Sequence, residues 1–250
     1  MVPLTRHGWR EMLIGTLALA LAALGLGLAF WPLALLTVPV LVWLFAFFRD
    51  PERRLPAQQN TMVSPADGTV SDIEKLDDVP LLKGPGWRVG IFLSVFNVHV
   101  NRSPCDGRVI DVTYRKGKFI NAMSHAKASE ENESNTVVLA EPHGDRPVAV
   151  VKQIVGLIAR RIIFTADKGE LLRRGDRIGM IKFGSRTELY IPVWLEPTIQ
   201  VKVGDKVRGA ADVIAVLKHP IEGVTPSDAP AVPKSVGDEF EPLVGRETPA

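Results

Sequence analysis

The sequence contains almost no cysteine, and its charges of the two signs nearly cancel. Cys105 is the only cysteine in 250 residues, which excludes an intramolecular disulfide framework and a cysteine-rich zinc site. Thirty Lys and Arg stand against 28 Asp and Glu, a formal net charge of +2. Nucleic-acid-binding domains are usually far more basic, so we expect no nucleic-acid partner. The hydrophobic share of 46% can build a packed core, which excludes global disorder.

Motifs for metal and phosphate binding are missing as well. The five histidines are scattered, and no His-x-x-x-His or His-Glu-x-x-His pair is present. There is no Walker A loop, no Gly-x-Gly-x-x-Gly fingerprint and no Gly-x-Ser-x-Gly nucleophile elbow. We therefore predict no metal site.

Charge is absent from one long stretch near the start of the chain. Residues 12–48 contain no Asp, Glu, Lys or Arg. As a single helix they would be much longer than the roughly 30 Å apolar core of a bilayer. Trp31-Pro32 divides the stretch, because proline cannot continue a helix cleanly. We predict a membrane anchor over residues 1–50, with apolar helices at about 12–30 and 33–48.

Basic residues flank both ends of this stretch. They are Arg6 and Arg10 on one side and Arg49, Arg53 and Arg54 on the other. A hairpin places both groups on one side of the membrane, which the positive-inside rule makes cytoplasmic. We expect a protein of the cell membrane with its catalytic domain on the cytoplasmic face. A single span and a helix pair lying in one leaflet are the alternatives.

The pattern changes after residue 50. Residues 51–62 form a polar, proline-bearing linker, and residues 63–219 carry short runs rich in Val, Ile and Thr between turns. This spacing is typical of a mostly β domain. Residues 121–133 give a weak helical signal. Residues 220–250 contain several prolines and acidic residues and are expected to form a loose C-terminal tail.

Two pairs of similar segments organise this β domain. Ser64-Pro-Ala-Asp-Gly matches Ser103-Pro-Cys-Asp-Gly, and residues 168–179 are similar to residues 199–209. Each segment contains an Asp-Gly or Gly-Asp turn that leads into a strand, where glycine supplies the backbone conformation of the turn. We predict a barrel-sandwich-like β domain with internal pseudo-repeats, preceded by an N-terminal hydrophobic helical hairpin.

Few side chains of the β domain are candidates for chemistry. His99 lies in a mostly apolar strand, where an enclosed structural histidine is the usual interpretation and a catalytic one the alternative. Asp67 and Asp106 each lie in a Pro-x-Asp-Gly turn, where aspartate commonly caps its own turn. Asp67 could cap its turn and also orient a histidine. Ser185 follows Gly184 between two strands, and by itself this pair indicates an ordinary turn.

Taken in order, a set of motifs resembles the phosphatidylserine decarboxylase family, most closely its shorter bacterial and archaeal branch. The motifs are Ser-Pro-Ala-Asp-Gly at 64–68, Phe-Leu-Ser at 92–94, His-Val-Asn-Arg-Ser-Pro-Cys-Asp-Gly at 99–107, Gly-Lys-Phe-Ile-Asn-Ala at 117–122, Glu-Asn-Glu-Ser-Asn at 131–135, Val-Lys-Gln-Ile-Val-Gly at 151–156 and Gly-Met-Ile-Lys-Phe-Gly-Ser at 179–185. The resemblance spans residues 62–216, with the anchor upstream also typical of the family.

The resemblance implies a proenzyme that cuts itself between Gly184 and Ser185 into a large chain, 1–184, and a small chain, 185–250. The Ser185 hydroxyl attacks the Gly184 carbonyl, and elimination followed by loss of ammonia turns Ser185 into a pyruvoyl group. A histidine oriented by an aspartate is the general means of activating such a hydroxyl. Asp67 and His99 match the family's positions, so the implied triad is Asp67–His99–Ser185.

The implied reaction is decarboxylation of phosphatidylserine to phosphatidylethanolamine and CO2. The substrate amine forms a Schiff base with the pyruvoyl cofactor, whose carbonyl accepts the electrons that CO2 leaves behind. His99 is the residue expected to deliver a proton. The implied partners are the phospholipid, the membrane and the two chains of one proenzyme, with a higher oligomer left open. Archaetidylserine would use the same head-group chemistry.

Two positions depart from the longer branch of the family. Arg102 stands where that branch has a second histidine. Either His99 therefore serves both self-cleavage and decarboxylation, or another group takes part, with His125 as a candidate. Arg186 follows Ser185 where that branch has threonine. Two interpretations of Arg186 are open: it binds the phosphate or the carboxylate of the substrate, or it is a surface residue.

Two other functions stay open on the sequence. A non-catalytic, membrane-anchored barrel-sandwich adaptor would share the anchor and the turns but would not need Gly184-Ser185. A small β-type zinc peptidase would need a closely spaced histidine pair, and the segment around His99 offers one histidine.

Overall fold

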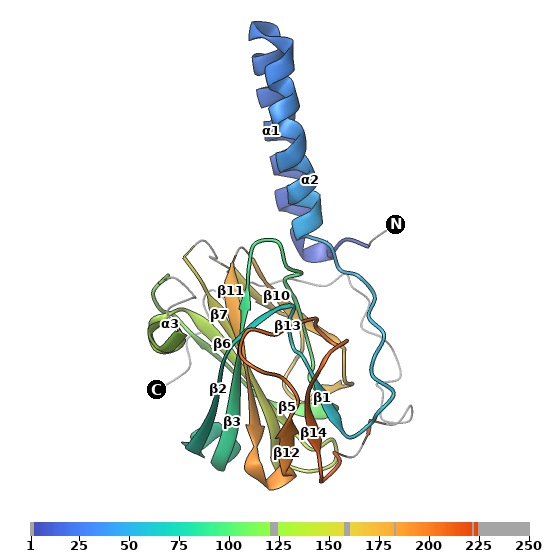
Figure 1. The fold of residues 1–250 in the computed structure, drawn as a ribbon, viewed down its shortest axis with the longest axis vertical. Helices are drawn as coiled ribbons and strands as arrows, with labels where there is room; N and C mark the ends of the chain where they lie inside the picture. The colour runs from blue at the N-terminus through green and yellow to red at the C-terminus, as the bar shows by residue number, and fades with distance from the viewer. Residues whose placement is uncertain (1–2, 121–124, 158–160, 183, 222, 225–250) are drawn as a thin grey trace.

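Two apolar helices stand away from the rest of the chain (Figure 1). The computed structural model describes residues 3–120, 125–157, 161–182, 184–221 and 223–224. Helix α1 spans Trp9–Ala29, and α2, Thr37–Phe47, runs back along it. A 3₁₀ helix over Trp31–Leu36 joins them, so α2 begins later than the predicted residue 33. The reason is that Pro32 starts a tighter turn that continues to Leu36 before α-helical geometry is established.

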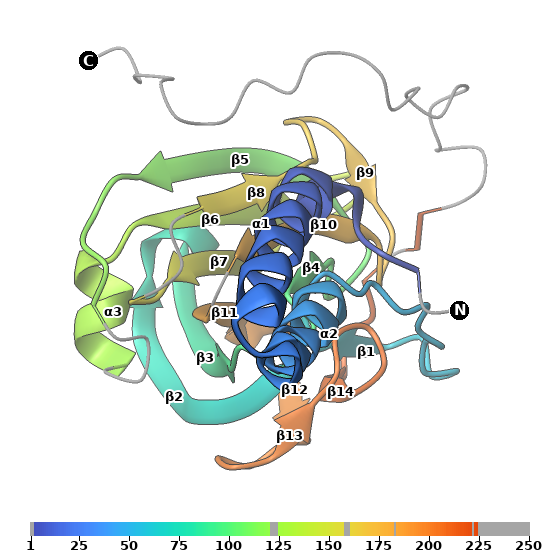
Figure 2. The same ribbon diagram turned by 90° about the horizontal axis from the view of Figure 1, so that it is seen from above.

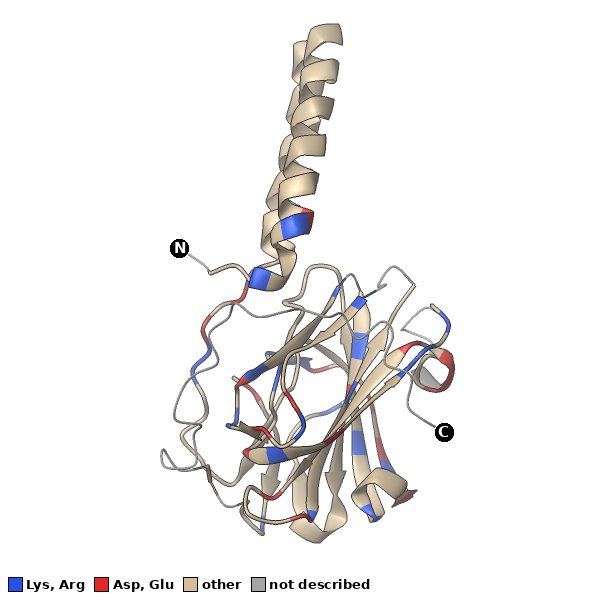
Figure 3. Cartoon of the chain, turned by 180° about the vertical axis from the view of Figure 1, so that it is seen from behind, with Lys and Arg blue, Asp and Glu red and all other residues tan. Residues whose placement is uncertain are grey.

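The helical hairpin exposes its apolar side chains. No residue of α1 is buried, and large side chains such as Leu21 and Leu28 are mostly exposed. Among the described residues, one helix, Arg6–Ala29, is long and apolar enough to cross a membrane, while the segment Trp31–Phe47 is shorter. Charged side chains lie at the hairpin base and in the β domain, and none lies along the shaft (Figure 3). A continuous apolar surface of this kind indicates association with a membrane.

The remaining described chain is mostly β, as predicted. Eight strands form one curled sheet in the order β13-β2-β3-β11-β7-β6-β5-β9, and two smaller sheets have the orders β1-β14-β12 and β4-β10-β8. The strands are β1 Thr61–Val63, β2 Gly68–Val79, β3 Gly84–Leu93, β4 Val100–Arg102, β5 Gly107–Arg115, β6 Ser134–Ala140, β7 Pro147–Val155, β8 Arg161–Phe164, β9 Leu171–Leu172, β10 Arg177–Lys182, β11 Ser185–Pro192, β12 Pro197–Ile199, β13 Lys206–Val207 and β14 Val213–Leu217. One short helix, α3 over His125–Glu131, precedes β6. Most of the predicted C-terminal tail, residues 222 and 225–250, lies outside the described residues.

The strand orders reveal two similar units, one inserted into the other. In the large sheet, β13-β2-β3-β11 is matched from the opposite edge by β9-β5-β6-β7, and the small sheets β1-β14-β12 and β4-β10-β8 match each other. One unit therefore consists of β1–β3 and β11–β14, and the other consists of β4–β10. The chain leaves the first unit after β3, completes the second and returns at β11.

The hydrogen bonds of the two units repeat as well. Ser64 Oγ donates to the Ala66 carbonyl at 2.7 Å, and Ser103 Oγ donates to the Cys105 carbonyl at the same distance. Across the interface, Val63 N–H donates to Pro104 O and Arg102 N–H to Pro65 O, each at 2.9 Å. The predicted pseudo-repeats are thus confirmed, and they lie face to face.

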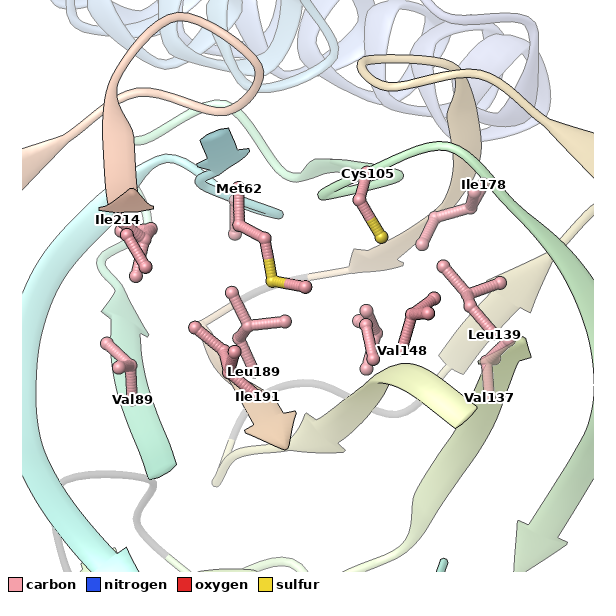
Figure 4. Close-up of a cluster of buried hydrophobic side chains, with 14 of the residues drawn as sticks. Met62, Val89, Cys105, Val137, Leu139, Val148, Ile178, Leu189, Ile191 and Ile214 are labelled. Atoms are coloured by element: carbon pink, nitrogen blue, oxygen red, sulfur yellow. The ribbon is translucent and has the colours of Figure 1, made fainter. Parts of the chain in front are cut away.

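The core fills the space between the curled sheet and the two small sheets (Figure 4). Val89, Leu189 and Ile191 point inward from the large sheet and meet Met62 and Ile214 from the sheet β1-β14-β12. These side chains are fully buried, and the same cluster contains Leu139 and Val148 of the other unit, so the core supplies the hydrophobic free energy that holds the two units together. Cys105 belongs to this core, and burial raises the pKa of its thiol, so it acts as a small apolar side chain.

Candidate functional site

The two points where the chain passes between the units lie side by side. Residues 94–99 lead from β3 into β4, and β10 ends at Lys182 shortly before β11 begins at Ser185. Strand β3 pairs with β11, with Leu93 opposite Ser185, and β4 pairs with β10. Because both pairings are antiparallel and adjacent, they bring His99 to Gly184 although the residues are 85 positions apart.

The His99 ring contacts the backbone at the predicted cut. Gly184 N–H donates to His99 Nε2 at 3.2 Å, and His99 Nδ1 lies 3.0 Å from the Asn97 carbonyl oxygen. Since a carbonyl only accepts, Nδ1 carries the proton and Nε2 presents its lone pair to Gly184. Gly184 has a φ of +64°, a conformation that glycine adopts without steric cost. An unprotonated ring nitrogen therefore lies beside the residue whose carbonyl is bonded to Ser185.

The base of the hairpin covers His99. The Phe47 ring, fully buried at the end of α2, lies with its centroid 4.3 Å from the imidazole centroid. Burial lowers the pKa of His99 to about 4, the Asn97 carbonyl opposes this, and the positive charge of Arg49 adds to it. His99 is therefore neutral at pH 7, in the form that can accept a proton.

Further contacts fix the hairpin base over this end of the β domain (Figure 2). Trp43 Nε1 donates to the Val95 carbonyl at 3.2 Å, and an Arg49 nitrogen donates to the Phe96 carbonyl at 2.7 Å. Lys182 at the end of β10 pairs with Glu11 of α1 at 2.6 Å. The hairpin is thus a structural part of the site. Its apolar pattern predicts a membrane helix and contains no signal for the Phe47 contact.

Ser185 is the first residue of β11 and is fully buried. Its backbone lies between β3 and β7, opposite Leu93 and Val155. Its Oγ has no hydrogen-bond partner among the residues that the structure describes. An unpaired buried polar group costs about 1–3 kcal/mol. This cost is expected for a hydroxyl that is consumed in a reaction. A pyruvoyl group at position 185 would carry a methyl group where the hydroxyl stood, which suits surroundings that offer Oγ no hydrogen-bond partner among the described residues.

Asp67 has other partners than the predicted one. Its Oδ1 accepts from Gly209 N–H at 2.8 Å, and its Oδ2 accepts from Arg53 at 2.6 Å. The first bond repeats in the other unit, where Asp106 accepts from Arg174 N–H at 2.6 Å. Within the described chain, Asp67 and Asp106 thus each accept from the backbone of a distant segment, and not from their own turns as the sequence suggested.

No hydrogen bond joins Asp67 to His99 within the described chain, where the Asn97 carbonyl faces Nδ1 instead. Burial raises the pKa of Asp67, and Gly209 N–H and Arg53 oppose this. The structure brings His99 to Gly184 and Ser185, and the role of Asp67 in the triad stays a prediction.

The two departures from the longer branch have structural roles. Arg102 is buried and binds Asp50, just after α2, at 2.7 Å, and it also donates to the Pro51 carbonyl. It therefore holds the linker against β4. Arg186 is fully buried, so the alternative of a surface residue is wrong, because Asp72 of β2 and Glu188 of its own strand supply acidic partners for it. His125 begins α3, and its side chain lies outside the described residues.

Comparison with known proteins agrees with this geometry. The family model described as phosphatidylserine decarboxylase matches residues 41–215. A phosphatidylserine decarboxylase proenzyme of Rhodopirellula baltica is 44% identical over 214 residues, 86% of this chain and 88% of the relative. Proenzymes of the same name from Granulibacter bethesdensis and Ralstonia nicotianae are 47% and 45% identical, and the matches cover 83% and 95% of those relatives. Because the family match extends over most of the chain and includes both crossings between the units, this protein belongs to the phosphatidylserine decarboxylase family, a family of decarboxylases.

Proposed function

We propose that the chain is a proenzyme that cuts itself between Gly184 and Ser185 and then decarboxylates phosphatidylserine to phosphatidylethanolamine and CO2. One observation carries the proposal: the unprotonated His99 Nε2 lies against Gly184, next to a buried Ser185 hydroxyl without a hydrogen-bond partner in the described chain. Membership of the family supports the substrate and the reaction.

Self-cleavage would use Ser185, the Gly184 carbonyl and His99, whose ring is already bonded to the Gly184 N–H. Ser185 Oγ bonds to the Gly184 carbonyl carbon, His99 takes the hydroxyl proton, and the peptide C–N bond breaks as its nitrogen is protonated, which leaves an ester. Loss of the Ser185 α-proton then breaks the Cβ–Oγ bond and frees the Gly184 carboxylate. Tautomerisation and addition of water expel ammonia and leave a ketone at position 185.

The pyruvoyl group formed in this way would supply a ketone carbonyl that captures the substrate amine and takes up the electron pair as CO2 leaves. The protein surrounds that position with β3, β7 and the His99 ring, which exclude bulk water. The bond between His99 Nε2 and the Gly184 N–H supports His99 as the side chain that would hold and return a proton there.

The hairpin accounts for access to a lipid. A phospholipid with two acyl chains stays in the bilayer, and the hairpin base lies over the end of the β domain that contains His99 and Ser185 (Figure 1). The site therefore faces the membrane surface. Arg6 and Arg10 precede the apolar stretch and Arg49 follows it, which suits anionic head groups. The positive-inside rule supports a β domain on the cytoplasmic side of the cell membrane.

The first test is the intact mass of the purified protein. The wild type should yield a small chain that begins at position 185 and is lighter than a serine-started chain by one ammonia. Ser185→Ala should remain a single chain, because it lacks the attacking hydroxyl. A folded wild-type protein that stays uncut would reject the decarboxylase function and favour the adaptor function.

The two chains should remain associated after the cut. Strand β11 pairs with β3 and β7, and β14 pairs with β1, so the small chain stays bound to the large chain by sheet hydrogen bonds and a shared core. Gel filtration in a mild detergent should show both chains in one peak. Separation of the chains without denaturant would contradict this arrangement.

The proposed role of Asp67 in the triad can be distinguished from its structural role in the turn. Asp67→Asn and Asp106→Asn remove the same charge from equivalent turns, and both variants keep an oxygen that accepts the backbone N–H. If Asp67 belongs to the triad, Asp67→Asn should slow self-cleavage by about 10²–10⁴-fold, and Asp106→Asn should change the rate little. Rates would be followed by gel electrophoresis after cell-free synthesis. Equal effects of the two substitutions would exclude Asp67 from the triad.

The Phe47 contact should be visible in the pH dependence of self-cleavage. With a His99 pKa of about 4, the base stays neutral and the rate should hold from pH 7 down to about pH 5. Phe47→Ala admits water to the ring, raises the pKa towards its ordinary value of 6.5, and should shift the acid limb to higher pH. Leu44→Ala is the control: it shortens another buried side chain of the same cluster but keeps the ring that lies against the imidazole, so it should keep the wild-type profile. If the acid limb of the pH–rate profile does not shift in Phe47→Ala, the Phe47 ring does not set the pKa of His99.

A further inference from the structure

Arg186, the residue after Ser185, lies at the centre of a buried charge cluster. Its side chain is fully buried and pairs with the equally buried Glu188 at 2.9 Å and with Asp72 of β2 at 2.6 Å. It also donates to Ser71 Oγ. Removing a charged group from water is costly, so a guanidinium is stable at this depth only because several acceptors surround it.

The guanidinium reaches from β11 across β3 to β2. The strand order is β2-β3-β11, and Gly90 of β3 lies opposite Asp72 on one side and Glu188 on the other. A Cβ at Gly90 would lie 2.0 Å from an Arg186 nitrogen, so the absence of a side chain there opens the path. Arg186 therefore ties the start of β11 to a strand that is not its direct neighbour.

This tie crosses the proposed cut. Ser71, Asp72 and Gly90 belong to residues 1–184, whereas Arg186 and Glu188 belong to residues 185–250. In the uncut chain, residue 185 is held from both sides, because Gly184 is itself bonded to His99. After the cut, residue 185 is a chain end, and chain ends fray unless other contacts hold them.

We propose that Arg186 is a positioning residue that holds the newly formed amino-terminal end of the small chain in the site after self-cleavage. This inference rests on the proposed function. In the intact chain, the covalent link through Gly184 holds residue 185 in place without Arg186. Once position 185 is a chain end, its position in the site depends on Arg186. Loss of Arg186 should therefore affect decarboxylation much more than self-cleavage.

The test compares the two steps in Arg186→Gln and Arg186→Lys. Arg186→Gln should cut itself at a rate close to that of the wild type, whereas kcat for phosphatidylserine in mixed micelles, per cut molecule, should fall about 10²-fold, the cost of a misplaced reacting group. Arg186→Lys keeps the charge without the planar fork and should lie between the two. Arg88→Gln is the control, because Arg88 also pairs with Asp72 but lies on β3 within the large chain. It should leave kcat unchanged.

A second measurement does not depend on activity. Hydrogen exchange of a peptide over residues 186–192 should be faster in cut Arg186→Gln than in the cut wild type. In uncut chains that carry Ser185→Ala, addition of Arg186→Gln should leave exchange unchanged. If Arg186→Gln and Arg186→Lys lose self-cleavage and decarboxylation to the same extent, or if exchange does not depend on the cut, Arg186 has a general structural role and the inference is overturned.

Failure of the proposed function would look different. A carbonyl-reactive hydrazide should label the small chain of the wild type, which is assayed before any variant. A wild type that is uncut or unlabelled would reject the proposed function itself, whereas a cut and labelled wild type with equal losses in the Arg186 variants would reject the positioning role alone.

Discussion

The pairing of β3 with β11 is the constraint on which the rest of the site depends. It closes one unit of the fold around the other, so the chain must cross between the units twice at neighbouring places. One crossing contains His99, and the other contains Gly184 and Ser185. His99 and the Gly184–Ser185 peptide, which are the base and the cut of the proposed function, therefore meet although they are far apart in sequence. Because β3 and β7 pair with both edges of β11, the body of the strand stays in the sheet without the covalent link at position 184.

Burial determines the electrostatics of this site. His99 is neutral because Phe47 and the surrounding strands keep water away from the ring, and its tautomer follows from the Asn97 carbonyl. The Ser185 hydroxyl lies in the same dry environment. On the other face of β11, Arg186 and Glu188 form a compensated charge cluster. Alternate residues of one strand thus serve two purposes, since successive side chains of a strand point to opposite faces.

The helical hairpin has two connected roles in this arrangement. Its shaft is apolar and exposed, which suits a bilayer, and its base supplies Phe47 to the site. Arg102 and Asp50 tie the end of the hairpin to β4 through a buried ion pair. The orientation of the β domain relative to the membrane is therefore coupled to the packing around His99.

The sequence by itself determined the apolar hairpin, the mostly β class, the pseudo-repeats and the identity of His99, Gly184 and Ser185 as candidates. These features are local: hydrophobic runs, turn residues and ordered motifs can be read without knowing which segments touch. The insertion of one unit into the other, the Phe47 contact and the burial of Arg186 depend on strand pairings between distant residues. The same holds for Asp67, whose turn motif is evident but whose partners Arg53 and Gly209 come from other parts of the chain. Only the tertiary structure decided these points, because burial and charge compensation are properties of what surrounds a side chain, and a motif does not encode its surroundings.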